Sequence, residues 1–175
     1  LTTFFASMRR IYMTKIAVII PSRLSAERLP NKPLSLINNK EMILHVYEKA
    51  VNSEVGEVFV ATPDKAIEEL IKKNGGSAIL TRTNHPTGTD RIFEAVEKKF
   101  DSKPEIIINL QGDMPNIDSE SIILLANQML KRKNEIATLA SKIENKEIKD
   151  KNIVKVKTEF EINQGIFSNA IDFFR

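Results

Sequence analysis

The sequence predicts an α/β protein with a mainly parallel, Rossmann-like sheet covered by helices on both faces. Short apolar runs, which suit buried strands, alternate along the chain with longer segments whose apolar residues recur at helical spacing. Strands that alternate with helices are joined by crossovers, and crossovers produce a parallel sheet. With 175 residues the chain can bury one sizeable core, so we expect a single domain over residues 13–175.

The predicted elements follow one another regularly. The predicted strands span residues 15–20, 58–61, 77–81, 105–110, 136–143 and 153–160, and the predicted helices span residues 41–53, 64–73, 88–100 and 120–132. The segment 105–110 gives the clearest signal for a buried strand, because four of its six residues are Ile or Leu without alternation. Residues 146–150 suit a charged turn or a short helix.

Local signals mark the ends of two helices. The sequence Asn74-Gly75-Gly76 should stop the helix at 64–73, since these residues tolerate positive φ. Asp118 or Ser119 can cap the helix at 120–132 by accepting a hydrogen bond from a free backbone N–H.

The C-terminal part fits the pattern less well. In the strand at 153–160, alternation places Val154 and Val156 on one face and Lys155 and Lys157 on the other. The segment 164–175 is rich in Ile and Phe, yet no further layer follows it. We therefore expect this segment either to pack back on the domain or to belong to something longer, with the domain incomplete at its C-terminus.

Composition limits the partners. The formal charge of +3 comes from lysines interspersed with acidic residues, which gives no stripe for nucleic acid, and a small anionic ligand explains the bias. The absence of cysteine excludes disulfides and thiolate metal sites and is compatible with the cytoplasm. No run approaches the ~20 apolar residues of a membrane helix. Residues 1–12 show no export signal, and we expect an extension without a role in the fold before Met13.

A basic loop follows the first strand. Residues 19–34 read IIPSRLSAERLPNKPL and place Arg23, Arg28 and Lys32 among prolines that restrict the backbone. Open α/β sheets bind ligands at the carboxyl ends of their strands, and phosphate needs Arg or Lys opposite its charge. The loop therefore predicts a polyphosphate site. The alternative is a solvated basic loop.

A second motif, Gln111-Gly112-Asp113-Met114-Pro115, follows the strand at 105–110. Gly112 allows a sharp exit, so Asp113 should project at the ligand edge of the sheet. Carboxylates beside phosphates commonly hold Mg²⁺ together with phosphate oxygens and water, which makes Asp113 a candidate metal ligand. An ordinary turn is the alternative, since Gly, Asp and Pro are frequent turn residues.

A third motif, residues 85–91 (HPTGTDR), joins a strand to a helix. Thr87 or Thr89 can cap that helix, and free N–H groups there suit an anion or the edge of a base. A well-capped helix start explains the same residues. His85 alone indicates nothing, and His45 lies in an amphipathic helix, where a structural role is favoured. Because Walker, dinucleotide, zinc and nucleophile-elbow motifs are lacking, phosphoryl or nucleotidyl chemistry remains.

Three ordered motifs resemble those of the CMP-sugar synthetases, most closely the 3-deoxy-manno-octulosonate (Kdo) cytidylyltransferases. They are IIPSRLSAERLPNKPL, LTRTNHPTGTDRI and INLQGDMP, and NIVKV resembles a further family segment. The resemblance covers residues 15–167, about the first two-thirds of such an enzyme by this comparison of motifs. It implies a fold of the nucleotide-diphospho-sugar transferase type.

The resemblance also implies an activity and its residues. The family transfers CMP from CTP to Kdo and releases pyrophosphate, in the cytoplasm, for lipopolysaccharide biosynthesis. By resemblance, Arg23, Arg28 and Lys32 would bind the triphosphate, and Asp113 would bind Mg²⁺. Two further groups follow in the same way: Thr89 and Arg91 would lie near the nucleotide, and Gln111 would contact the sugar acid or the nucleotide.

Some positions depart from the family pattern. Met114 stands where an acidic residue is usual, Pro63 stands where Asp is usual with Asp64 as a partial substitute, and Asn169 stands where Arg is common. The family's second metal-binding Asp, its sugar-binding histidine segment and part of its dimer-forming region lie beyond the resemblance. The sequence therefore leaves two alternatives to a Kdo enzyme: an inactive nucleotide-binding remnant or half of a split enzyme, and a synthetase for another acidic sugar such as sialic acid.

Overall fold

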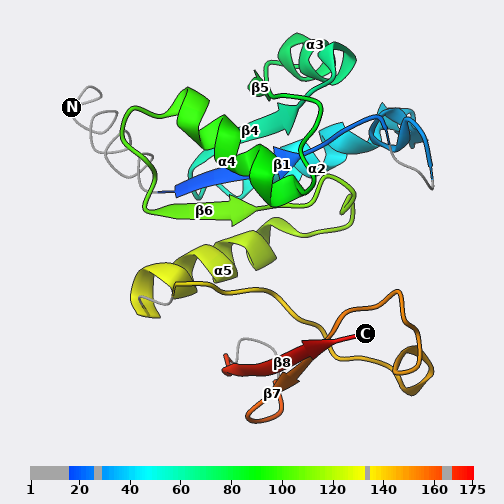
Figure 1. Ribbon diagram of the computed structural model, residues 1–175, viewed down its shortest axis with the longest axis vertical. Helices are drawn as coiled ribbons and strands as arrows, with labels where there is room; N and C mark the ends of the chain where they lie inside the picture. Colours follow the sequence, from blue (N-terminus) through cyan, green and yellow to red (C-terminus); the bar gives the residue numbers. More distant parts are fainter. Residues whose placement is uncertain (1–15, 26–28, 133–134, 163–166) are drawn as a thin grey trace. The chain divides into compact units, whose positions relative to one another are not determined.

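The computed structural model describes residues 16–25, 29–132, 135–162 and 167–175 (Figure 1). The described residues group into two compact units, one within residues 1–133 and the other within residues 134–175. The domain bounds 13–175 stay a prediction. The predicted extension at 1–12 lies outside the described residues. Among the residues that are described, no helix is long and apolar enough to cross a membrane.

A four-stranded parallel sheet forms the centre of the first unit (Figure 1). Its strands are β1 (Ile16–Pro21), β4 (Glu57–Thr62), β5 (Ala78–Leu80) and β6 (Ile106–Asn109), in the order β5-β4-β1-β6. In the register of the central pair, Val18 of β1 lies opposite Val58 of β4. The prediction of a mainly parallel α/β sheet, including four of its strands, is confirmed.

Four helices accompany the sheet. They are α2 (Met42–Asn52), α3 (Lys65–Lys73), α4 (Gly88–Lys99) and α5 (Ser119–Arg132), close to the predicted bounds. Asp118 caps the start of α5, since its Oδ1 accepts a hydrogen bond of 2.6 Å from the Ser121 N–H. After α3, Gly75 takes a φ of +74°, which is the conformation that the predicted stop requires.

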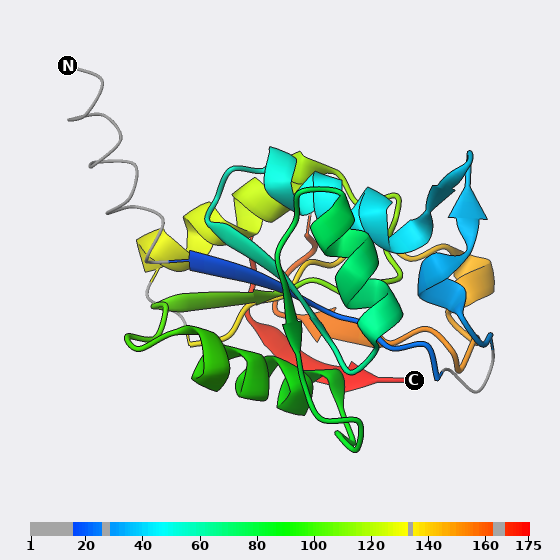
Figure 2. The same ribbon diagram turned by 90° about the horizontal axis from the view of Figure 1, so that it is seen from above.

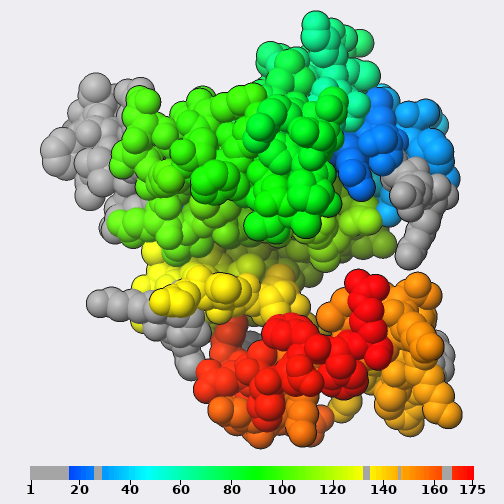
Figure 3. All heavy atoms as spheres, in the orientation of Figure 1, coloured from blue at the N-terminus to red at the C-terminus, as the bar shows by residue number. Residues whose placement is uncertain are grey.

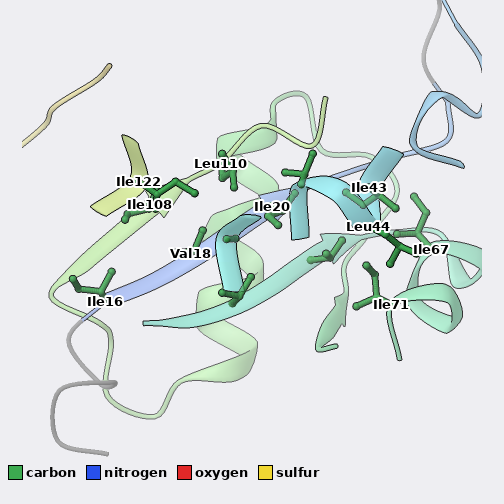
Figure 4. Close-up of a cluster of buried hydrophobic side chains, with 14 of the residues drawn as sticks. Ile16, Val18, Ile20, Ile43, Leu44, Ile67, Ile71, Ile108, Leu110 and Ile122 are labelled. Carbon is green, nitrogen blue, oxygen red and sulfur yellow. The ribbon is translucent and has the colours of Figure 1, made fainter. Parts of the chain in front are cut away.

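The two faces of β1 are buried under different helices. Ile16, Val18 and Ile20 pack in one core with side chains from α2, α3 and α5, as Figure 4 shows. Ala17 and Ile19 pack with side chains of α4, which contributes to the green surface in Figure 3. In Figure 2 the sheet is seen with α4 on one side and α2 and α5 on the other. The continuous apolar run of β1 follows from this burial on both faces.

The predicted strand at 105–110 is present, but the prediction that it is buried holds for only part of it. This segment forms β6, which lies at an edge of the four-stranded sheet. Ile108 is buried under α5, whereas Ile107 on the other face is 43% exposed, because α4 packs over β1, β4 and β5. An apolar run indicates a strand but does not say how many neighbours cover it.

A small hairpin precedes α2. After the 3₁₀ helix η1 (Lys32–Leu34), strands β2 (Leu36–Ile37) and β3 (Lys40–Glu41) pair in antiparallel fashion. Asn38 and Asn39 form the turn with positive φ, which Asn tolerates better than most residues. His45 Nε2 lies 2.9 Å from the Ile37 carbonyl oxygen, a contact that agrees with the structural role predicted for His45.

The second unit differs most from the prediction. It contains the 3₁₀ helix η2 (Asn145–Glu147), which overlaps the charged turn or short helix predicted at 146–150. It also contains the antiparallel pair β7 (Lys155–Thr158) and β8 (Ala170–Phe174). The predicted strand at 136–143 is wrong: these residues form no strand, and Ile136 is 87% exposed. Part of the segment 164–175 forms β8, where Ile171, Phe173 and Phe174 are exposed, while residues 163–166 lie outside the described part.

Burial in and next to β7 does not follow the alternation of apolar and basic residues. Lys155 is buried, and its Nζ donates a hydrogen bond to the Asp150 carbonyl oxygen, whereas Val154 is 54% exposed. The long lysine side chain can bury its methylene groups when its ammonium group finds an acceptor. Alternation therefore identified the strand but did not show which of its residues are buried.

Candidate functional site

A cavity of about 350 Å³ opens at the carboxyl ends of β1 and β6. Its wall combines segments that follow both strands with η1, the start of α2 and the start of α4. The lining residues that carry polar or charged groups are Ser22, Arg23, Lys32, His85, Thr87, Arg91, Gln111 and Asp113. Open α/β sheets bind their ligands at this edge, and the volume lies in the range of about 300–1,000 Å³ that is usual for ligand sites.

Pro21 brings the segments of this wall together. A Cβ at Gly112 would lie 2.9 Å from the Pro21 carbonyl oxygen, and a Cβ at Gly88 would lie 3.3 Å from Pro21 Cγ. The loop after β6 and the start of α4 therefore reach the end of β1 because both positions lack a side chain. Close approach, rather than the predicted sharp exit, explains the need for glycine at position 112.

The basic loop is anchored at two points. The Leu24 N–H donates a hydrogen bond of 2.8 Å to Asp64 Oδ2, and the Asn31 N–H donates one of 3.0 Å to the Leu24 carbonyl oxygen. Asn31 takes a φ of 58°, the left-handed conformation, directly before Lys32. These contacts fix the backbone on both sides of the loop, unlike that of a freely solvated loop. Arg28 lies outside the described residues.

Lys32 and Asp113 form an ion pair across the cavity. Lys32 Nζ lies 2.8 Å from Asp113 Oδ2, and both side chains are partly exposed. The two charged groups predicted to serve one ligand thus meet, although 81 positions separate them in sequence. Exposed pairs of this kind contribute at most about 1 kcal/mol, so a charged ligand can exchange either partner.

Arg91 adds a buried positive charge. Its NH1 donates hydrogen bonds to Thr81 Oγ1, at 2.5 Å, and to the Arg82 carbonyl oxygen, at 2.9 Å. Burial lowers the pKa of Arg91, and the positive charge of Arg23 acts in the same direction, while Asp64 opposes it. A guanidinium group remains charged under these conditions, so Arg91 supplies a fixed cation to the cavity wall.

Of the two other predicted site residues, Gln111 lies in the cavity wall and Thr89 does not. Gln111 lines the cavity, and its Nε2 donates a 2.9 Å hydrogen bond to Asn109 Oδ1. Thr89 is exposed and does not line the cavity. The cap of α4 is Thr87, whose Oγ1 accepts a hydrogen bond of 3.1 Å from the Asp90 N–H.

Sequence reasoning missed a pair formed by His85 and Glu94. His85 lines the cavity, only 7% of its side chain is exposed, and its Nε2 contacts Glu94 Oε2. Glu94 also accepts hydrogen bonds from Lys98 Nζ and the Arg82 N–H. Burial raises the pKa of Glu94, but the hydrogen bonds from Lys98, His85 and Arg82 outweigh it and lower the pKa to about 2. No motif links these residues, because the loop at 82–87 must first fold over α4.

Asp113 is the group suited to a cation. Among the described residues, no three His, Cys, Asp or Glu side chains gather where they could hold a metal ion. Mg²⁺ commonly uses one or two carboxylates and completes its shell with phosphate oxygens and water. A single carboxylate at the mouth of a cationic cavity fits that pattern. The Ser22 hydroxyl, buried in the same wall, has no hydrogen-bond partner among the described residues.

Comparison with known proteins agrees with the motifs. The profile of the Cytidylyltransferase family matches residues 17–175. The 3-deoxy-manno-octulosonate cytidylyltransferase of Thermodesulfovibrio yellowstonii is 45% identical over 145 residues, which cover 79% of this chain and 57% of that protein. The enzyme of the same name from Pectobacterium carotovorum is 42% identical over 154 residues, which cover 87% of this chain and 62% of that protein.

A solved structure agrees as well. The structure of CMP:2-keto-3-deoxy-manno-octonic acid synthetase complexed with CTP matches with a TM-score of 0.80 at 38% identity, over 91% of this chain and 64% of that chain. This chain therefore spans less than two-thirds of the relatives it matches, and the resemblance drawn from the three motifs is confirmed. On its sequence and its fold, the chain belongs to the cytidylyltransferase family.

Proposed function

We propose that the protein takes part in the transfer of CMP from CTP to Kdo, giving CMP-Kdo and pyrophosphate for lipopolysaccharide biosynthesis in the cytoplasm. The observation that carries the proposal is the convergence of Arg23, Lys32, Arg91 and Asp113 on one cavity at the ligand edge of the sheet. Three cations suit a triphosphate, and one carboxylate suits a cation bound to it. Relatives named for this activity support the choice of substrates.

In this reaction the anomeric hydroxyl oxygen of Kdo attacks the α-phosphorus of CTP. The bond between that phosphorus and the β-phosphate oxygen breaks, pyrophosphate leaves with its electron pair, and the hydroxyl proton passes to solvent. Such transfers depend on in-line positioning and charge stabilisation rather than on a protein nucleophile. Arg23 and Lys32 would bind the triphosphate and offset the charge that develops on the leaving group. Arg28 is assigned the same role by family resemblance.

The remaining assignments concern binding. Asp113 would hold Mg²⁺, and bound Mg²⁺ would neutralise phosphate charge. Gln111 would contact the sugar acid or the nucleotide, and its hydrogen bond to Asn109 would keep its amide oriented. Arg91 would stabilise bound phosphate from the cavity wall. The role of Thr89 near the nucleotide stays a prediction of the resemblance, and its exposure outside the cavity wall gives it no further support.

Binding and turnover are separate questions for a chain that spans 57% of the T. yellowstonii relative. Isothermal titration with CTP and Mg²⁺ tests the first, and a pyrophosphate-release assay with Kdo tests the second. The control reactions contain sialic acid or no sugar. Turnover with Kdo alone would support the full proposal, whereas binding without turnover would reduce the protein to a nucleotide-binding unit. No binding at millimolar CTP would refute both.

A further inference from the structure

His85 occupies a position in the cavity wall that the proposed roles leave unused. Its side chain is 7% exposed and lines the cavity beside the start of α4. Nε2 contacts the Glu94 carboxylate, and in the described part of the chain Nδ1 has no hydrogen-bond partner. One nitrogen of the ring is therefore held by the protein, while the other is available to a ligand.

The electrostatic surroundings of the ring are mixed. The titratable and charged groups around His85 come from α4, the loop before it and the rest of the cavity wall: Glu94, Lys98, Arg82, Arg91, Arg23, Lys32 and Asp113. Glu94 places a negative charge in direct contact with the ring, whereas the arginines and Lys32 contribute positive charge to the same cavity wall. A bound anion would add a negative charge beside the ring, and a nearby negative charge favours a protonated imidazole.

We propose that His85 is a ligand-binding residue, in which the imidazolium Nδ1–H donates a hydrogen bond to a phosphate oxygen of the bound nucleotide. Glu94 is the positioning residue that holds Nε2–H and thereby fixes the orientation of the ring. This assignment rests on the proposed function, because it requires a phosphate ligand in the cavity.

The tautomer explains why a proton must accompany the ligand. Glu94 is ionised at neutral pH because its pKa lies at about 2, so it accepts a hydrogen bond and Nε2 carries the donor. In a neutral ring Nδ1 then presents a lone pair, which repels phosphate oxygen. Only the doubly protonated ring donates on both sides. We therefore expect nucleotide binding to be accompanied by proton uptake at His85.

The chain provides a matched control, because it contains only two histidines. His45 contacts the Ile37 carbonyl oxygen and does not line the cavity. Calorimetric titration of CTP at pH 7.5, in two buffers with different ionisation enthalpies, measures proton uptake in the wild type, His85→Gln and His45→Gln. Protonation of CTP itself is common to all three.

We expect the wild type and His45→Gln to take up more protons than His85→Gln. We also expect His85→Gln to bind CTP roughly tenfold more weakly, in line with the loss of one charge-assisted hydrogen bond. Equal proton uptake and equal affinity in His85→Gln would overturn the assignment of His85 and leave the proposed function intact. Failure of the wild type to bind CTP would instead refute the proposed function, and the assignment with it.

Should His85→Gln fail to fold by circular dichroism, the wild type alone decides the matter. The imidazole resonances of the two histidines are followed by NMR across pH 5.5–8.5, with and without CTP. We expect CTP to move the titration midpoint of the His85 signal upward and to leave the His45 signal in place. An unmoved His85 signal in the presence of saturating CTP would overturn the assignment.

Discussion

Lys32 Nζ and Asp113 Oδ2 lie 2.8 Å apart across the mouth of the cavity. Each is assigned to a different part of the same ligand, Lys32 to the triphosphate and Asp113 to the metal that accompanies it. In the absence of ligand the two charges neutralise each other. Ligand binding must therefore exchange this ion pair for new partners on both sides.

This exchange predicts an effect of Asp113→Asn that depends on the metal. Without divalent cation, the variant should bind CTP more tightly by up to about 1 kcal/mol, because Lys32 is freed and a negative charge is removed. Addition of Mg²⁺ should raise the CTP affinity of the variant less than it raises that of the wild type. Calorimetry in EDTA and in Mg²⁺ measures the CTP affinity under each condition.

Glu48→Gln is the control for that experiment. It removes an equally short, equally exposed ion pair, between Lys40 and Glu48, whose members do not line the cavity. Its CTP affinity should match that of the wild type in both buffers. If Mg²⁺ strengthens binding equally in Asp113→Asn and in the wild type, Asp113 is not the metal ligand.

Arg23 should be a main source of nucleotide affinity. We expect Arg23→Ala to weaken CTP binding by about 1.5–3 kcal/mol, the range for a hydrogen bond to a charged group. Lys72→Ala removes an exposed cation on α3 whose partner is Glu68, and it should leave affinity unchanged. Unchanged affinity in Arg23→Ala would remove the triphosphate assignment.

Asp64 should stabilise the backbone of the basic loop. Asp64→Ala deletes the acceptor of the Leu24 N–H and should lower the free energy of unfolding by about 1–3 kcal/mol. Hydrogen exchange at the Leu24 amide should accelerate in the same variant. Glu69→Gln, at an exposed position of α3, serves as the control. Slow exchange at Leu24 in Asp64→Ala would show that another contact holds the loop.

Asn31 tests the importance of the left-handed turn before Lys32. Asn31→Ala should destabilise the fold by about 1 kcal/mol, because Ala adopts the left-handed conformation at positive φ less readily than Asn. Asn31→Gly should retain stability, because glycine adopts this conformation freely. Urea denaturation of the wild type and the two variants measures their free energies of unfolding. Equal losses of stability in Asn31→Ala and Asn31→Gly would show that the Asn31 side chain, and not the backbone conformation, is responsible.

Glu94 should make stability depend on pH in the acid range. Its pKa falls from 4.5 to about 2 on folding, so the ionised form is the one that folding favours. The stabilisation is complete above pH 4.5 and is lost as the pH falls through 2. At pH 7, Glu94→Gln should be less stable than the wild type by about 1–3 kcal/mol, and the difference should shrink toward pH 2.

Urea denaturation at several pH values checks the Glu94 prediction. Glu97→Gln, which breaks the exposed ion pair with Lys103, is the control and should change stability little at any pH. The difference in free energy of unfolding between Glu94→Gln and the wild type could instead stay constant down to pH 2. The ionised Glu94 carboxylate would then not be the source of the pH-dependent stability.

The parts that sequence alone predicted are those decided by local pattern. The apolar run of β1, the helical spacing of α2 and the Asp118 cap of α5 depend on neighbours in sequence, and all three are found. The meeting of Arg23, Lys32 and Asp113 was also predictable, since the carboxyl ends of parallel strands share one edge.

The errors concern long-range contacts. Ile107 is exposed because β6 lies at an edge, which no residue of β6 itself encodes. Lys155 is buried because the Asp150 carbonyl oxygen accepts from its ammonium group, against the alternation of β7. The pair of His85 and Glu94 forms only when a loop closes over α4.

The contact between Pro21 and Gly112 has a consequence for engineering. Because the backbone at the end of β1 sets the spacing of the two loops, added bulk at Gly112 would displace a whole rim of the cavity rather than one side chain. Libraries aimed at new ligand preferences should therefore vary cavity-lining side chains such as Gln111 and keep Gly88 and Gly112 constant. The tolerance of this scaffold to redesign is set by two residues that carry no functional group.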